Sequence, residues 1–257
     1  MIAVITDHGS DDLFMGVLKG NFSYLLPKEE IIEVTRPISF GDSYVASCIA
    51  ERLACHLPKS TIFMIVVDGQ NESARRPVGL RTKDDRIFIG FDNGTFTLPI
   101  ERFGLKQIRE IDVPEVKFSL SFTRSVLDIL IPVAVDLSKG RNFESIGSIY
   151  MTFYDLKHKR AGIVDGKIKG EVAFINERGD ISTNIPFDYL EKMGLSQEDK
   201  LKINGKLSSI SLDRRAGRKN ELIVCEGLGG YVEITSRYSR AGEILNLPSR
   251  SEIVLEV

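Results

Sequence analysis

An acidic turn near the amino terminus is the part of this sequence best equipped for chemistry. An apolar run over residues 1–5 is followed within seven residues by Asp7, Asp11 and Asp12, with His8 among them. Clustered like charges repel, so the carboxylates need partners. Carboxylate oxygens bind calcium, and they also accept hydrogen bonds from hydroxyl and ammonium groups. The turn therefore indicates a site for a cation or for a polar small molecule; the structural alternative is an acidic first helical turn.

A second acidic residue follows the strongest strand-like segment. Residues 61–67 are continuously apolar and rich in branched side chains, which is typical of a buried parallel strand, and Asp68 comes next. Arg75, seven residues later, could hold the Asp68 carboxylate ionised and aimed. The pair is equally consistent with a structural salt bridge. Asn93 lies in the sequence FDNG at residues 91–94, which has the composition of a turn.

The elements that must position these residues alternate along the first half of the chain. The pattern predicts strands at 1–5, 31–35, 61–67 and 86–90, and helices at 13–26, 43–57 and 127–137, the last kinked by Pro132. Such alternation predicts an α/β domain with a central, mostly parallel sheet covered on both faces. Ligands bind at the carboxyl ends of such strands, where Asp7 and Asp68 would lie.

The second half has a different pattern. Glycines separate short alternating runs at residues 172–175, 203–210, 221–225 and 231–235, as in an all-β module. We therefore predict an α/β domain over residues 1–155 and a smaller all-β domain, a barrel or sandwich, over residues 165–257.

The composition of the chain limits the kinds of molecule that we expect it to bind. The 257 residues are 42% hydrophobic and 27% charged, with a net charge of −2, so we expect no nucleic-acid partner. We interpret the basic clusters, including residues 214–219, as solvated surface. No apolar run reaches the ~20 residues of a membrane span. Three cysteines without metal-ligand spacing, and no secretory signal, predict a cytoplasmic protein.

Six motifs in order resemble the S-adenosylmethionine hydrolases (hydroxide adenosyltransferases), which share a fold with fluorinase and chlorinase. The resemblance covers nearly the whole chain and implies that the domain over residues 1–155 binds a nucleoside. Each motif is weak alone, but their order and spacing are fairly specific. The segments are TDHGSDDLFMGVLKG (6–20), EVTRPISFGD (33–42), VVDGQNESARRP (66–77), FDNG (91–94), NERGDISTNI (176–185) and GYVEIT (230–235).

The resemblance implies roles for individual residues. Asp7 would accept hydrogen bonds from the ribose hydroxyls, and Asp12 would hold the methionine ammonium. Phe40 would pack on the sugar. Asp68 and Arg75 match two members of a trio that orients the attacking water. The resemblance further implies a homotrimer with sites between subunits, S-adenosyl-L-methionine as a small-molecule substrate, and no metal or cofactor.

The remaining substrate-binding candidates follow from the same motifs. They are Asn93 of the FDNG segment, Asn176 and Asp180 of the β domain, and Leu228 before the last motif. Asn176 stands where the family has its amino-acid-binding Asp, and Asp180 stands where the family has Asn. Leu228 replaces a serine whose hydroxyl holds the methionine carboxylate.

The catalytic trio also departs from the family pattern. The segment TRSVLDILIPVA at residues 123–134 places Ser125, or Thr123 after a one-residue shift, where the family has a histidine. Neither is a base. Loss of general-base assistance typically costs ~10² to 10⁴ in rate. His8 is a possible substitute, although its position next to Asp7 suggests that it points elsewhere.

Several functions therefore stay open on sequence alone. The first is S-adenosylmethionine hydrolysis by water attack at C5′ with an altered trio. The second is a catalytically weak paralogue that binds S-adenosylmethionine or adenosine, and the third is a reaction on another 5′-substituted adenosine. A calcium-dependent nucleoside hydrolase is the fourth, because the acidic turn matches part of that family's DTDxGxDD pattern, with Ile5 in place of the leading Asp. Halogenation is not expected, because Asp68 would repel a halide.

Overall fold

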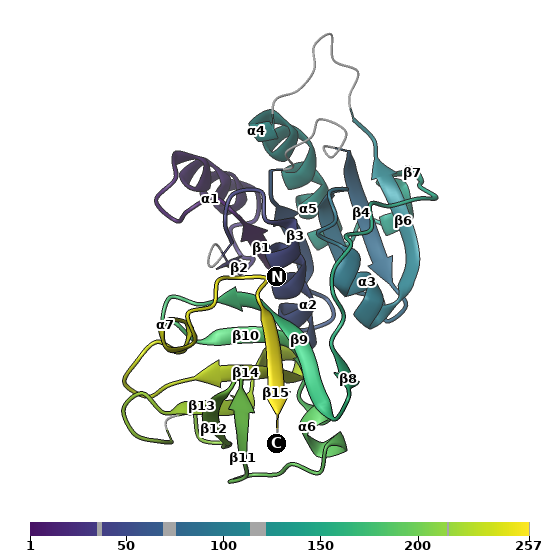
Figure 1. The fold of residues 1–257 in the computed structure, drawn as a ribbon. Helices are drawn as coiled ribbons and strands as arrows, with labels where there is room; N and C mark the ends of the chain where they lie inside the picture. The colour runs from purple at the N-terminus through teal and green to yellow at the C-terminus, as the bar shows by residue number, and fades with distance from the viewer. Residues whose placement is uncertain (35–37, 69–75, 114–121, 215, 257) are drawn as a thin grey trace. The chain divides into compact units, whose positions relative to one another are not determined.

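The computed structural model describes residues 1–34, 38–68, 76–113, 122–214 and 216–256. It divides into two compact units, Met1–Leu156 and Lys157–Val257, and each is described by itself. Figure 1 shows the elements of both units, coloured along the chain.

A seven-stranded sheet organises the first unit, in the order β2-β1-β3-β5-β4-β6-β7 (Figure 1). Strands β2, β1, β3 and β5 pair in parallel, and β4, β6 and β7 continue the sheet with antiparallel pairings. Five of these seven strands consequently point in one direction, which confirms a mixed α/β unit with a mostly parallel sheet. The bounds are β1 (Ile2–Thr6), β2 (Ile31–Val34), β3 (Ile62–Val66), β4 (Pro77–Thr82), β5 (Ile87–Phe91), β6 (Leu105–Ile111) and β7 (Gly147–Ile149).

Helices cover both faces of this sheet. Val4 and Met64 belong to a core shared with Phe22 and with the helices α1 and α5. Phe63 points to the other face, stacks on Phe88 with ring centroids 4.8 Å apart, and lies on the side where α2 contacts β1 and β3. The alternation of side chains along each strand thus buries both faces. The helices are α1 (Leu13–Leu25), α2 (Ser43–His56), α3 (Thr97–Phe103), α4 (Phe122–Ser125) and α5 (Ile131–Ser138).

Two aspartates end the loops that lead into helices. Asp12 is the N-cap of α1 and accepts a hydrogen bond from the Phe14 N–H at 2.8 Å. Asp42 caps α2 in the same way, through the Val45 N–H at 3.1 Å. The predicted helices are therefore confirmed, but the acidic residues precede α1 rather than forming its first turn. A carboxylate at the N-cap satisfies a backbone N–H that has no intrahelical partner.

The predicted kink at Pro132 takes a different form. Residues Val126–Leu130 form a π-helical turn that leads into α5, and the Ile131 N–H bonds to the Val126 carbonyl, five residues back. Proline lacks an N–H and its ring displaces the carbonyl four residues earlier. Widening the preceding turn accommodates both effects without breaking the helix, and such π turns are frequent near functional sites.

The second unit is a closed β structure. Its strand order is β10-β14-β13-β12-β11-β15-β9-β8, and a further pairing between β10 and β9 closes the ring. The short helices α6 (Asp188–Lys192) and α7 (Ala241–Leu245) were not predicted. The strands are β8 (Gly162–Val164), β9 (Lys167–Ile175), β10 (Ile181–Pro186), β11 (Lys200–Ile203), β12 (Lys206–Ile210), β13 (Leu222–Glu226), β14 (Tyr231–Thr235) and β15 (Glu252–Glu256).

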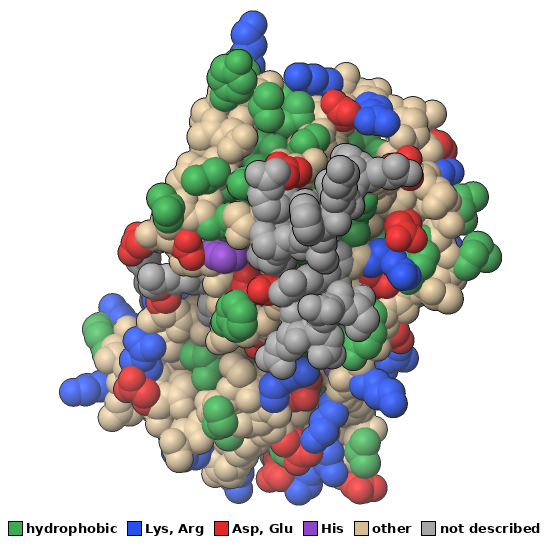
Figure 2. Space-filling view, turned by 90° about the horizontal axis from the view of Figure 1, so that it is seen from above, with side chains coloured by type: hydrophobic (Ala, Val, Ile, Leu, Met, Phe, Trp, Pro, Cys, Tyr) green, Lys and Arg blue, Asp and Glu red, His purple; other side chains and the backbone are tan. Residues whose placement is uncertain are grey.

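The surface agrees with the balanced composition. On the face seen in Figure 2, Lys and Arg side chains are interspersed with Asp and Glu side chains and with hydrophobic ones. Across the described ranges, no helix combines the length and apolar character needed to cross a bilayer.

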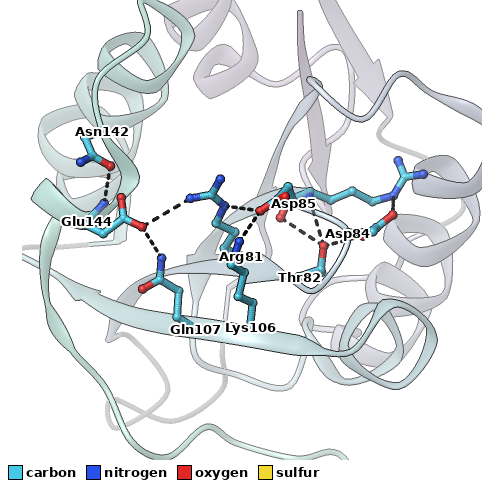
Figure 3. A network of polar contacts seen from close by, with 9 residues as sticks. Arg81, Thr82, Asp84, Asp85, Lys106, Gln107, Asn142 and Glu144 are labelled. Atoms are coloured by element: carbon cyan, nitrogen blue, oxygen red, sulfur yellow. Dashed lines mark hydrogen bonds and ion pairs between the residues drawn. The ribbon is translucent and has the colours of Figure 1, made fainter.

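A polar network ties β4, the turn after it and β6 together (Figure 3). Arg81 pairs with Asp85 at 2.9 Å and with Glu144 at 3.3 Å, and Lys106 pairs with Asp85 at 2.7 Å. At the buried end of the network, the Thr82 hydroxyl donates to Asp84 and accepts from the Arg86 N–H at 2.9 Å.

We predict that the buried end of this network matters more for stability than the exposed end. Thr82→Val keeps the side-chain shape but leaves the Arg86 N–H without this acceptor, which should lower the free energy of unfolding by about 1–3 kcal/mol. Lys106→Met removes a surface ion pair and should cost at most about 1 kcal/mol. Urea denaturation measures both; an equal or larger loss for Lys106→Met would contradict the assignment.

Candidate active site at the carboxyl edge of the first sheet

The structure brings Asp7 and Asp68 together where the sequence predicted. Strands β1 and β3 are adjacent and parallel, with Thr6 opposite Val66, so the residues that follow them emerge at the same edge. The Asp7 Oδ2 atom accepts hydrogen bonds from the Gly41 N–H at 2.8 Å and the Asp68 N–H at 3.4 Å. Three chain segments therefore converge on one carboxylate.

The second carboxylate oxygen of Asp7 is suited to accept a hydrogen bond from a ligand. Within the described part of the chain, Asp7 Oδ1 is buried and has no hydrogen-bond partner. Burial raises the pKa of Asp7, while the Gly41 N–H and the charge of His8 oppose that rise. A buried acceptor without a donor costs free energy, which a ligand hydroxyl would recover. Asp7 is thus suited to accept hydrogen bonds from a polyol such as a ribose.

Phe40 and Asn93 lie near this carboxylate but have different surroundings. Phe40 directly precedes Gly41 and is 71% exposed, so its ring is available to pack on a ligand. Asn93 is buried in the turn after β5, and its Nδ2 donates to the Val67 carbonyl at 2.9 Å. Asn93 therefore fixes the backbone immediately before Asp68, a positioning role that the sequence did not predict.

Asp12 and His8 form a pair that was not predicted from the sequence. The His8 Nδ1 atom lies 2.9 Å from Asp12 Oδ2, and the imidazole packs against the Phe14 ring with centroids 4.4 Å apart. The hydrogen bond with His8 is the main cause that lowers the pKa of Asp12, followed by the Phe14 N–H. The four-residue spacing across the turn was the available signal for this contact.

The other members of the predicted trio are only partly described. Arg75 lies outside the described residues. Ser125 is buried at the end of α4, directly before the π turn, and Thr123 is exposed. A serine or threonine hydroxyl is not a base at neutral pH. The part of the chain that aligns with the family histidine therefore supplies no base of its own.

The second unit holds Asn176 and Asp180 in one connected turn. Asn176 Oδ1 accepts from the Asp180 N–H at 3.0 Å, and its Nδ2 donates to Asp180 Oδ2 at 3.1 Å. Asp180 is buried, and its Oδ1 accepts from the Thr235 hydroxyl at 2.6 Å. The two residues are thus adjacent, as their motif requires.

Arg214 supplies the positive charge for this turn. Its Nη2 lies 3.4 Å from Asp180 Oδ2 and also pairs with Glu233. Arg214 is exposed, as we expected for this basic cluster, but it is also ion-paired to two buried carboxylates. Burial among these charges also raises the pKa of Cys225 to about 12, with desolvation the largest cause. Leu228 lies in a short 3₁₀ turn, Leu228–Gly230, and is 58% exposed.

Metal binding was one alternative for the acidic turn. Among the residues that the structure describes, no group of three or more His, Cys, Asp or Glu side chains is arranged to hold a metal ion. The oxygens of Asp12 instead meet the helix N–H and His8.

Comparison with known families decides the membership of the chain. The model of the SAM hydroxide adenosyltransferase N-terminal domain matches residues 2–147. The chain belongs to this family. The motif resemblance is thereby confirmed, and membership in the hydroxide adenosyltransferase family replaces the nucleoside-hydrolase alternative.

Individual proteins match nearly the whole length of the chain. The (R)-S-adenosyl-L-methionine hydrolase of Methanocaldococcus jannaschii is 24% identical over 262 residues, which cover 98% of this chain and 94% of the relative. A crystal structure of an uncharacterized conserved protein from Thermotoga maritima covers 100% of both chains at 30% identity, with a TM-score of 0.91. A conserved hypothetical protein from Thermus thermophilus shares the fold at 20% identity, with a TM-score of 0.74 over 99% of this chain and 98% of its own.

Asp7→Asn tests the binding role of the buried carboxylate. The amide keeps an acceptor for the Gly41 N–H but loses the charge, so adenosine affinity should fall about 10- to 100-fold, the equivalent of one charged hydrogen bond. Because burial raises the pKa of Asp7, its ionised form opposes folding. The variant should therefore unfold at higher temperature at neutral pH, and this gain should shrink as the pH falls toward 3.8, the ordinary pKa.

Calorimetric titration with adenosine and thermal denaturation across pH measure the two effects. Asp11→Asn is the matched control, because Asp11 lies in the same turn but is exposed. Unchanged adenosine affinity in Asp7→Asn, or an equal loss in Asp11→Asn, would contradict the assignment.

Proposed function

We propose that this protein hydrolyses S-adenosyl-L-methionine to adenosine and L-methionine by attack of water at C5′. The observation that carries the proposal is the Asp7 carboxylate, whose Oδ2 is held by two backbone N–H groups while its buried Oδ1 lacks a donor among the described residues. Membership in the hydroxide adenosyltransferase family supports it, as does the hydrolase from Methanocaldococcus jannaschii that matches 98% of the chain.

The proposed reaction requires the site to position the substrate, orient a water and remove a proton from it. The ribose hydroxyls donate to Asp7, and Phe40 packs on the sugar, which fixes C5′ relative to the edge of the sheet. Asp68 and Arg75 orient a water in line with the C5′–S bond. The leaving group is a neutral thioether, so no general acid is required, and the remaining task is to take a proton from the water.

The second unit would bind the amino-acid part of the substrate with residues that differ from the family pattern. We propose that Asn176, Asp180 and Leu228 contribute to this subsite and that Asp12 holds the methionine ammonium. Since Arg214 already pairs with Asp180, the methionine ammonium would meet a less negative surface than a lone carboxylate offers. From the family resemblance we also propose a cytoplasmic homotrimer that needs no cofactor and has no nucleic-acid partner.

A second candidate function is supported by a specific observation. Ser125 stands where the family has its histidine, and it is buried at the end of α4. A protein without an effective base would bind S-adenosylmethionine or adenosine with little turnover. The two candidates differ only in the appearance of products.

The proposed activity predicts that the purified protein converts S-adenosylmethionine to equal amounts of adenosine and methionine. Asp68→Asn should remove the carboxylate that orients the water, lowering kcat by about 10²- to 10⁴-fold while leaving substrate affinity within a few-fold. Chromatography of the products and calorimetric titration measure the two quantities.

Asp165→Asn is the control, because Asp165 is an exposed turn residue of the second unit with a φ of 51° that asparagine tolerates. Tight binding of S-adenosylmethionine with no product above background would favour the weak-paralogue function. Unchanged turnover in Asp68→Asn would remove Asp68 from the mechanism.

A further inference from the structure

The proposed reaction needs a group that takes a proton from the attacking water. The sequence contains three histidines. His56 is the last residue of α2, and His158 belongs to the second unit. His8 follows β1 at the carboxyl edge of the sheet, next to Asp7. An imidazole is the side chain whose ordinary pKa suits proton transfer near neutral pH.

We propose that His8, oriented by Asp12, is the proton acceptor in this protein and acts in place of the histidine that its family carries where Ser125 stands here. This inference rests on the proposed hydrolysis of S-adenosylmethionine. It assigns the catalytic base to the acidic turn after β1 rather than to the α4 segment.

The contacts of His8 fix its ring in one orientation. Asp12 Oδ2 lies 2.9 Å from Nδ1, and the other oxygen of Asp12 is held by the Phe14 N–H at 2.8 Å, so the carboxylate cannot rotate away without uncapping α1. The Phe14 ring packs on the imidazole, and the His8 backbone N–H bonds to the Thr6 hydroxyl at 3.2 Å. Backbone, helix cap and aromatic contact together orient the ring.

This arrangement also selects the tautomer. An ionised carboxylate only accepts hydrogen bonds, so Nδ1 carries the proton that Asp12 binds, and Nε2 is the basic nitrogen of the neutral ring. A carboxylate that orients an imidazole and stabilises its protonated form is the role that the aspartate has in histidine-dependent hydrolysis.

Two carboxylates interact with the His8 ring. Asp12 pairs with the ring directly, and the charge of His8 also acts on the Asp7 carboxylate. Phe14, from α1, faces the ring without charge. An imidazolium formed in the transition state would therefore be attracted by both carboxylates.

The proton and electron balance is complete without another reactant. The water oxygen forms a bond to C5′ as the C5′–S bond breaks, and the bonding pair leaves with sulfur, which becomes the neutral thioether of methionine. The water loses one proton to His8 Nε2, and the second stays as the 5′-hydroxyl of adenosine. His8 then returns its proton to solvent, so the sum is substrate plus water giving adenosine, methionine and a proton.

The test separates chemistry from structural support. His8→Asn retains a side-chain donor for Asp12 but cannot accept a proton, so kcat should fall by about 10²- to 10⁴-fold with KM changed only a few-fold. His8→Ala opens a space beside Phe14, and added imidazole should restore part of its turnover. His56→Gln, on α2, is the matched control and should keep the wild-type kcat.

The pH profile provides a readout that a structural role would not move. In the wild type, kcat should fall on the acid side, and the same limb should be absent from the residual activity of His8→Asn. Thermal denaturation of each variant checks that the fold is kept.

The outcomes distinguish this inference from the function on which it rests. Wild-type turnover with an unchanged kcat and pH profile in His8→Asn would overturn the role of His8 alone. A folded His8→Ala variant whose lost turnover imidazole does not restore would also overturn it. A wild-type protein that forms no adenosine would overturn the proposed function and this inference together.

Discussion

The hydrogen bonds from the Gly41 and Asp68 N–H groups to Asp7 Oδ2 are the constraint on which the site depends. They join the ends of two parallel strands to the loop before α2 through one buried carboxylate. Burial raises the pKa of this group, so the folded protein holds Asp7 at some cost to stability. Such a cost is typical of a functional group rather than a structural one. Among the described residues, Asp7 Oδ1 has no hydrogen-bond donor. A ligand hydroxyl that bound there would recover part of this free energy.

The arrangement of the sheet explains how a few residues can form the site. Because β1 and β3 are parallel and adjacent, Asp7 and Asp68 emerge side by side without long loops. Asn93, after the neighbouring strand β5, donates a hydrogen bond to the carbonyl of the residue before Asp68. This bond fixes the position of the backbone where the loop after β3 begins. The same edge carries His8 and Asp12, whose contact both orients an imidazole and caps α1. One strand edge thus positions the groups for binding and the group proposed for proton transfer.

The sequence predicted the parallel part of the sheet and the convergence of Asp7 with Asp68, because both follow from strand periodicity and strand direction. It did not predict β6, whose apolar residues Leu105, Ile108 and Ile111 recur every three positions, a spacing closer to a helix than to a strand. Contacts between distant segments were also missed. Arg214 lies 34 residues from Asp180, and nothing in its basic run indicated an ion pair with that carboxylate.

Ligand geometry at Asp7 tests the central claim most directly. A crystal structure of the protein with adenosine should place the ribose hydroxyls within hydrogen-bond distance of Asp7 Oδ1, with the sugar against Phe40 and C5′ facing Asp68. Adenosine bound elsewhere, or a crevice at this strand edge filled by the protein's own side chains with the nucleoside absent, would contradict the account.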